Sequence, residues 1–487
     1  MRFESASKLA LCALLLSGCT GVIGEGGDLE PSGVAGAAPP RIGRDAGAGA
    51  EPDLDAGQAS TPDAGSTPDA SVRPPSCDPM TAPPLAARAL RITHVTVNQG
   101  VSVPLVDESV PVNARQAPLV ANREGVLRVF VQPQSGWQAR DVTARLTLSG
   151  TTRDVQVRVT NASSATALES TINFALAPGE LAESATFSVE LLELDPCGTY
   201  VGVVNGARYP SSNAESLDVE AAPGQFRIVI VPVRYQADGS NRTPTTDGAT
   251  VARFRARMYG MFPLADLDVS IRQAPLDFCA QGCVAGLGPV PSAGDSFNRA
   301  AIGLLYENGV ETFVHEIGHT LGLFHAPCGG ATGADPDFPY GSGGIGVLGF
   351  DIAAQRLLDT QHRDVMGYCG PVWISDYNYD KLYDRLVTVT ASSSTSLKRA
   401  KTPLALRPVI VDIDGTLSIG DTIWIDNAPL GEVVTVEWVG ESGQSEELSA
   451  TLVRVSHLPG GIIYVPEMPD PPEVIRIRGY GTATYRR

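Results

Sequence analysis

Three histidines lie close together in the stretch HEIGHTLGLFH, which runs from His315 to His325 and contains half of the six histidines in the chain. On a helix, residues four apart share a face, so His315 and His319 can direct their imidazoles at one point, with Glu316 beside it. Gly322 can adopt the positive φ that ends a helix, and the chain can then bring His325 back to the same point. Three imidazoles and a neighbouring carboxylate are groups that hold a metal ion and take a proton from water.

The ligand types favour a catalytic metal over a structural one. Catalytic Zn²⁺ takes three protein ligands and keeps one position for water, whereas structural zinc sites are closed and usually rich in cysteine. A chance match to His-Glu-x-x-His-x-x-Gly-x-x-His somewhere in this chain is on the order of one in a hundred thousand. We therefore predict one catalytic Zn²⁺ bound by His315, His319 and His325.

The stretch resembles the signature of the metzincin zinc metallopeptidases. A second hallmark of that family, a methionine turn, is matched by Asp364-Val-Met-Gly-Tyr-Cys369. The resemblance implies that Met366 lies beneath the metal as a packing floor, and that Tyr368 contacts the zinc or steadies an oxyanion. The alternatives are an ordinary core methionine and an ordinary packed aromatic residue. The resemblance covers only the middle region, about a third of the chain.

A zinc-dependent endopeptidase is the function that this resemblance implies. Zn²⁺ would let water ionise near neutral pH, and Glu316 would take that proton and return it to the leaving amine. Family members bind substrate as an added antiparallel strand at a sheet edge, and Cys283-Val-Ala-Gly-Leu-Gly288 resembles that edge. The expected substrates are extracellular proteins or glycoproteins. A combined interpretation, cleavage of glycoproteins such as mucins, would use both the peptidase domain and the flanking β-domains. The alternative is an adhesin or glycan-binding lipoprotein with an accessory peptidase domain.

The N-terminus has the features of an export signal. Arg2 and Lys8 precede an apolar run, Leu9 to Leu16, that is too short to span a bilayer as a helix. Leu16-Ser-Gly-Cys19 resembles the lipobox of bacterial lipoproteins, which implies a signal peptide at 1–18 and an acylated Cys19. Plain secretion with cleavage elsewhere is the alternative. We expect an exported lipoprotein at the outer membrane or cell surface, attached to the membrane by lipid alone.

Composition divides the rest of the chain into a tether and three folded regions. Residues 19–76 are rich in Pro, Ala, Gly and Asp, so we expect a disordered tether. Residues 77–222 show alternating apolar runs that predict an antiparallel β-sandwich. Residues 223–390 mix strands and helices and are expected to form the metzincin-like α/β peptidase domain. Residues 391–487 predict a second antiparallel β-domain, so the fold class is multidomain α+β.

Apolar spacing predicts particular elements in the middle region. These are a strand over 226–233, a helix whose buried face includes Val251, Phe254, Met258 and Met261, a strand over 268–271, and a helix over 373–386. Asp335, Asp337 and Asp351 lie in a Gly/Pro-rich loop and could hold Ca²⁺, although nothing in the pattern establishes their geometry. His362 is expected to face solvent.

The eight cysteines agree with export to an oxidising compartment. Cys12 leaves with the signal peptide and Cys19 takes the lipid, which leaves six cysteines and fifteen possible connectivities. Proximity favours the pairs Cys279–Cys283, Cys328–Cys369 and Cys77–Cys197. An alternative role for Cys77 is that of a thiolate that caps the zinc and keeps the enzyme latent.

The net charge argues against nucleic acid as a partner. With 54 acidic and 36 basic residues the chain carries a formal charge of −18, which would repel a phosphate backbone. No segment after the N-terminal run is long and apolar enough for a transmembrane helix. The oligomeric state is left open.

Overall fold

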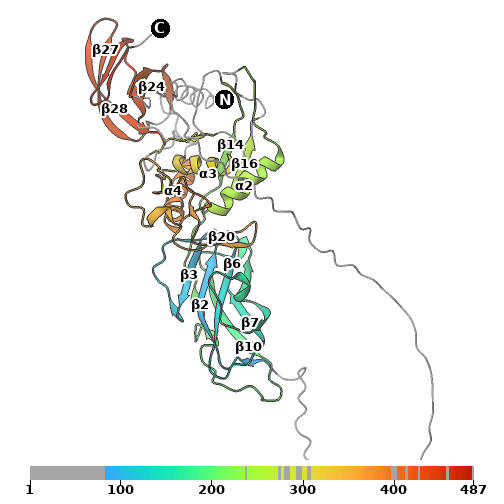
Figure 1. Ribbon diagram of the computed structural model, residues 1–487. Coiled ribbons are helices and arrows are strands. Elements are labelled where there is room, and N and C mark those ends of the chain that lie inside the picture. Colours follow the sequence, from blue (N-terminus) through green and yellow to red (C-terminus); the bar gives the residue numbers. More distant parts are fainter. Residues whose placement is uncertain are drawn as a thin grey trace, which may run out of the picture.

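The computed structural model describes residues 83–235, 239–272, 276–278, 286–291, 299–303, 309–395, 403–411, 415–425, 428–456 and 460–484. Along the molecule, blue and green N-terminal sheets lead to a middle region with helices and then to a red C-terminal sheet (Figure 1). The predicted signal peptide, tether, Cys19, Cys77, Cys279 and Cys283 lie outside the described residues. Within the described part of the chain, no helix is long and apolar enough to cross a membrane.

Two antiparallel sheets make up the N-terminal region. Their strands are β1 (Leu85–Ala86), β2 (Leu90–Asn98), β3 (Ser102–Asp107), β4 (Val110–Pro111), β6 (Gly125–Pro133), β7 (Arg140–Leu148), β8 (Thr151–Val159), β9 (Ile172–Leu176) and β10 (Thr186–Glu193). One sheet has the order β1-β10-β7-β8, and β11 (Arg208–Tyr209) and β12 (Glu215–Ser216) also pair with β10. The other has the order β4-β3-β2-β6-β9. Alternate side chains of β7 are buried, because one face of the strand packs on the shared core.

Short strands and 3₁₀ turns lie in the loops of the N-terminal and middle regions. The strands are β5 (Leu119–Val120), which pairs with β13 (Val219–Glu220), and β20 (Gly349–Asp351), which pairs with β21 (Arg356–Leu358). Short 3₁₀ turns lie at Leu168–Ser170, Pro178–Glu180 and Gly341–Gly343.

The middle region begins with a parallel βαβ unit. β14 (Phe226–Ile230) pairs in parallel with β16 (Leu267–Ile271), and α2 (Gly248–Met261) lies between them in the chain. Asp247 caps α2, because its carboxylate accepts a hydrogen bond from the main-chain N–H of Thr250 at 2.8 Å. Phe254, Met258 and Met261 are buried, as their spacing predicted, whereas Val251, expected on the same face, is only partly buried.

The strand predicted over 226–233 is interrupted in the structure. β14 ends at Ile230, and β15 (Val233–Tyr235) pairs with β17 (Leu276–Phe278). Pro232 lies between the two strands and has no N–H to donate to a ladder, which is a physical reason for the break.

Helix α3 (Gly309–Thr320) carries the histidine-rich sequence. It contacts α2, where the rings of Phe254 and Phe313 meet edge to face with centroids 5.0 Å apart. The antiparallel pair β18 (Gly286–Leu287) and β19 (Ile302–Gly303) also contacts α3.

The helix predicted over 373–386 begins later than expected. α4 (Asp376–Thr395) starts after Trp373, which belongs to β23 (Val372–Trp373) and pairs in parallel with β22 (Arg363–Asp364). The indole N–H of Trp373 donates to the carbonyl of Gly100 at 2.7 Å. This tertiary contact and the strand pairing keep Trp373 outside the helix.

The N-terminal and middle regions share a buried interface. Arg123 is fully buried and donates to the main-chain carbonyls of Gln99 at 2.9 Å and Leu264 at 2.6 Å. Apolar side chains of both regions belong to one continuous core. The N-terminal sheets therefore support the middle region that carries α3.

The C-terminal region is one antiparallel sheet. Its strands are β24 (Leu404–Val411), β25 (Leu417–Ile419), β26 (Ile423–Ile425), β27 (Glu432–Gly440), β28 (Ser445–Arg454), β29 (Gly461–Pro466), β30 (Pro472–Ile477) and β31 (Gly481–Thr484). The order is β25-β24-β29-β28-β27-β30-β31, with β26 beside β24. Because β25 and β31 contact each other although they end this order, the sheet curls around its core.

Candidate metal centre

Three imidazoles converge at the C-terminal end of α3. The Nε2 atom of His319 lies 3.0 Å from Nε2 of His315 and 3.1 Å from Nε2 of His325. All three side chains are buried. In the part of the chain that the structure describes, they are the one group of three or more His, Cys, Asp or Glu side chains close enough to hold a metal ion.

The turn after α3 brings the third imidazole to the other two. Gly322 has a φ of +88°, a conformation that glycine adopts without steric cost. The N–H of Gly322 donates to His319 O at 2.8 Å, and the N–H of Leu323 donates to Gly318 O at 3.1 Å. These two bonds form a Schellman motif, which ends the helix and reverses the chain toward His325, as the sequence predicted.

Each imidazole is oriented by a main-chain carbonyl. The Nδ1 atoms of His315, His319 and His325 lie 2.7, 2.7 and 2.5 Å from the carbonyl oxygens of Val365, Leu323 and Thr332. A carbonyl oxygen can only accept, so each Nδ1 carries the proton and each Nε2 presents a lone pair.

This donor set fits a divalent cation. Lone pairs that face one another at such distances repel each other unless a positive charge lies between them. A tetrahedral Zn²⁺ with Zn–N distances of about 2.0–2.1 Å separates its ligand atoms by roughly 3.3–3.4 Å. The observed separations of 3.0 and 3.1 Å are close to that value. The three imidazoles can therefore hold a metal ion.

Met366 lies against α3 at Gly318, the residue before His319. It is fully buried, and a Cβ added to Gly318 would lie only 2.6 Å from the Met366 sulfur. Asp364 organises this turn by accepting hydrogen bonds from the N–H groups of Met366 and Ser375 and from the Asn378 amide, each at 2.8 Å. Burial raises the pKa of the Asp364 carboxyl, and these hydrogen bonds act in the opposite direction.

Tyr368 reaches the imidazoles from the solvent side. Its hydroxyl lies 3.2 Å from Nε2 of His325, and the residue is 45 % exposed. Burial, followed by the negative charge of Glu316, raises the pKa of Tyr368 to about 12. A cation bound by the imidazoles would lower this pKa. The phenol is thus close enough to interact with a group bound at the metal.

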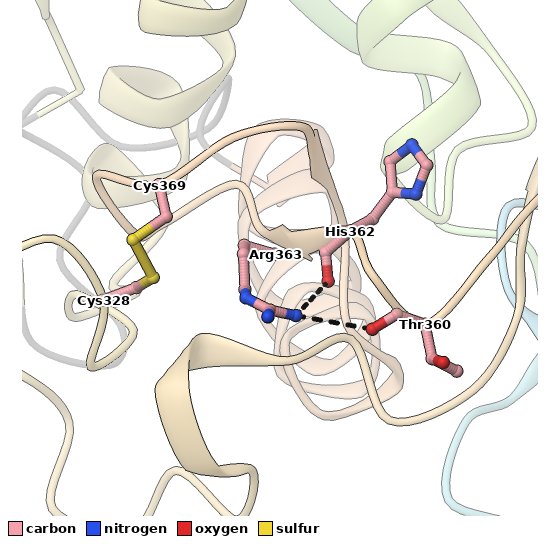
Figure 2. The surroundings of a disulfide bond; sticks show 5 residues. All are labelled: Cys328, Thr360, His362, Arg363 and Cys369. Carbon is pink, nitrogen blue, oxygen red and sulfur yellow. Dashed lines mark hydrogen bonds between the residues drawn. A yellow bond between two sulfur atoms is a disulfide. The ribbon is translucent and has the colours of Figure 1, made fainter.

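Cys328 and Cys369 form the disulfide that proximity predicted, with an S–S distance of 2.07 Å (Figure 2). The bond ties the segment after His325 to the methionine turn. Tyr368, next to Cys369, also donates its main-chain N–H to Cys328 O at 3.1 Å. Cys197 is disulfide-bonded as well, while Cys77, its predicted partner, lies outside the described residues.

His362 takes no part in the imidazole group. Its ring points away from the disulfide in Figure 2, and its Nδ1 lies 3.0 Å from Oδ1 of Asp359. The residue is partly buried rather than fully exposed to solvent.

The carboxylates considered for Ca²⁺ do not converge. Asp335 accepts hydrogen bonds from Lys381 Nζ at 2.7 Å and from the Tyr377 hydroxyl at 3.0 Å. Asp337 is exposed, and Asp351 accepts a hydrogen bond from a main-chain N–H in its own loop. Lys381 neutralises Asp335, and the other two carboxylates do not join it. Within the part of the chain that the structure describes, these three residues therefore form no calcium site.

Glu316 is 1 % exposed and contacts a residue that the sequence analysis missed. The hydroxyl of Ser456 lies 3.2 Å from Glu316 Oε2, across 140 positions in the chain. No local pattern predicts such a contact. Gly288 was expected only as the end of an edge strand, yet a Cβ there would lie 2.7 Å from Glu316 O.

The sequence profile of the family named peptidase M66 matches residues 297–370. The match supports a peptidase function for this chain. The matched segment includes all of the following residues: His315, Glu316, His319, His325, Met366 and Tyr368. Together with the three imidazoles, the match supports a metallopeptidase family and a metal cofactor. No curated protein sequence matches the chain.

Proposed function

We propose that the chain is a zinc-dependent endopeptidase of metzincin type that cleaves extracellular proteins from a lipid-tethered position on a bacterial surface. The observation that carries this proposal is the convergence of three imidazoles whose Nδ1 atoms are all engaged by carbonyls. The peptidase M66 match supports the reaction class. When bound, Zn²⁺ supplies Lewis acidity, which activates water near neutral pH and polarises a carbonyl oxygen.

Glu316 moves the protons in this mechanism. Its carboxylate takes a proton from the attacking water and passes it to the nitrogen of the leaving amine. It lies one position after His315 on α3, so the helix carries the base and a ligand together. The hydroxyl of Tyr368 donates a hydrogen bond to the carbonyl oxygen that gains negative charge. Its place 3.2 Å from His325 Nε2 supports this role.

The surface location rests on the N-terminal sequence. Acylation of Cys19 would anchor the chain, and a flexible tether over 19–76 would give an r.m.s. reach of roughly 40 Å. In this proposal the catalytic region stands clear of the membrane and meets large substrates.

Cleavage of casein by the purified protein tests the proposal. We expect one Zn²⁺ per chain by metal analysis, and activity that is lost with a chelator and restored by Zn²⁺. Glu316→Ala should lower kcat/KM by about 10²- to 10⁴-fold and keep the metal, because Glu316 is not a ligand. His319→Ala, the matched variant, should lose the metal as well.

Two results would reject the proposal. One is folded protein without bound zinc. The other is wild-type protein without chelator-sensitive cleavage, while Glu316→Ala still binds cells or glycans normally, which would favour an adhesin or glycan-binding lipoprotein.

A further inference from the structure

The C-terminal sheet reaches the candidate site through residues 454–456, at the end of β28. The N–H of Val290 donates to the carbonyl of Arg454 at 3.0 Å, and the N–H of Ser456 donates to the carbonyl of Gly288 at 2.8 Å. An isolated antiparallel bridge joins the residues between these two bonds. The 454–456 segment therefore lies on the 288–290 segment as one antiparallel strand lies on another.

The side chain of Ser456 extends this pairing to Glu316. Its hydroxyl accepts a hydrogen bond from the N–H of Gly288 at 2.9 Å and donates to Glu316 Oε2 at 3.2 Å. Ser456 is 4 % exposed and Glu316 is 1 % exposed. The hydroxyl thus covers the carboxylate on the side where the 288–290 segment runs.

Apolar packing supports the same contact. Ile302 of β19 packs against a buried cluster of the C-terminal sheet that includes Val453 and Val455. β19 pairs with β18, and β18 leads directly into the 288–290 segment. The C-terminal sheet is therefore placed by apolar contact as well as by hydrogen bonds.

A peptide substrate would need the same space. Under the proposed function, Glu316 has to reach both the attacking water and the nitrogen of the scissile bond, so the substrate main chain must pass beside its carboxylate. Extended peptides commonly bind by adding a strand to an exposed sheet edge. In this structure the 454–456 segment already supplies a strand at residues 288–290 and a hydroxyl at Glu316.

We infer that the 454–456 segment is an internal competitor for extended peptides, and that substrate binding displaces it from residues 288–290. The inference rests on the proposed function for its consequence in catalysis. The C-terminal sheet then closes the Glu316 side of the site. Tyr368, which is 45 % exposed, marks the side that remains accessible.

Peptide binding to the metal-free, full-length protein tests this competition without cleavage. The probe is a fluorescently labelled peptide from reduced and alkylated casein. Ser456→Ala removes the hydroxyl, and Ser456→Pro removes the hydroxyl and the N–H. One hydrogen bond changes the equilibrium between the paired and the displaced 454–456 segment by about two- to tenfold. We therefore expect the Kd of the peptide to fall about threefold in Ser456→Ala and about tenfold in Ser456→Pro. Ser445→Ala, at the other end of β28, should leave Kd unchanged.

Hydrogen–deuterium exchange reports the pairing itself. The amides of Gly288 and Val290 should exchange faster in Ser456→Pro than in the wild type. Ser456→Ala preserves the main chain, so its threefold effect decides the question if the proline variant unfolds the C-terminal sheet.

Three results have distinct meanings. Unchanged peptide affinity in both Ser456 variants, despite faster exchange, would overturn the inference. A lower kcat at constant KM in zinc-loaded Ser456→Ala, restored by Ser456→Thr, would also overturn it and make Ser456 a positioning residue for Glu316. Absence of chelator-sensitive cleavage in every variant would reject the proposed function, while peptide binding to the metal-free protein would still decide the competition.

Discussion

Replacement of Gly318 by alanine tests the close packing of Met366 beneath α3. The added Cβ would lie 2.6 Å from Sδ and 3.3 Å from Cε of Met366, which is fully buried. Ordinary contacts between non-bonded heavy atoms are about 3.5–4.0 Å, so the sulfur would have to move by about 1 Å. The neighbouring side chain of Leu323 is 3.5 Å from the same Cβ and leaves little room for this movement.

Two effects of opposite sign decide the outcome. Alanine stabilises a helix interior by about 1 kcal/mol relative to glycine, whereas overpacking a buried site costs about 1–3 kcal/mol. We therefore expect Gly318→Ala to lower the free energy of unfolding by about 1 kcal/mol. In a Met366→Ala background the clash is absent, and the same substitution should stabilise by about 1 kcal/mol. The coupling energy between the two positions is then about 2 kcal/mol.

Urea denaturation followed by far-ultraviolet circular dichroism measures the four free energies of this cycle. Gly248→Ala in α2 is the control, because nothing lies within 4 Å of its added Cβ. It should be neutral or slightly stabilising. One result would refute the close approach of the sulfur to α3. It is that Gly318→Ala raises the free energy of unfolding by the same amount whether residue 366 is methionine or alanine.

The other predictions concern the surroundings of the site and the N-terminal sheets. Replacing both Cys328 and Cys369 by serine should lower the free energy of unfolding by up to about 4 kcal/mol, because the disulfide no longer restricts the 41-residue loop in the unfolded chain. An unchanged midpoint of urea denaturation would contradict this. Asp364→Asn should weaken zinc binding about 10- to 100-fold in a chelator competition, because an NH2 donor replaces one of the two oxygens that accept hydrogen bonds in the turn that orients His315; equal affinity would contradict it. Burial opposes ionisation of Asp195, but hydrogen bonds from Thr199, Tyr200 and Arg88 outweigh it and lower its pKa to about 2. The ionised Asp195 should therefore stabilise the folded protein fully above a pH of about 4, and this contribution should disappear toward pH 2. In urea denaturation at a series of pH values, Asp195→Asn should remove this pH dependence.

Local sequence was sufficient to predict the imidazole group. The spacing of His315 and His319 places them on one helix face, and Gly322 supplies the positive φ of the turn that returns His325. These features depend on bonds between residues a few positions apart, so they can be derived without knowledge of the fold. Helical periodicity is also local, so it predicted the buried positions Phe254, Met258 and Met261 of α2, although Val251 on the same face is only partly buried.

Distant segments decided the remainder. The helix start near Trp373 was mispredicted because the indole bonds to Gly100, 273 positions away. The carbonyl of Val365 that orients His315 and the hydroxyl of Ser456 at Glu316 also come from other parts of the chain. A periodic pattern reports which face of an element is buried, but it does not identify the segment that covers that face. That choice depends on the packing of whole regions, and therefore only the tertiary structure shows what surrounds the metal ligands and their neighbouring carboxylate.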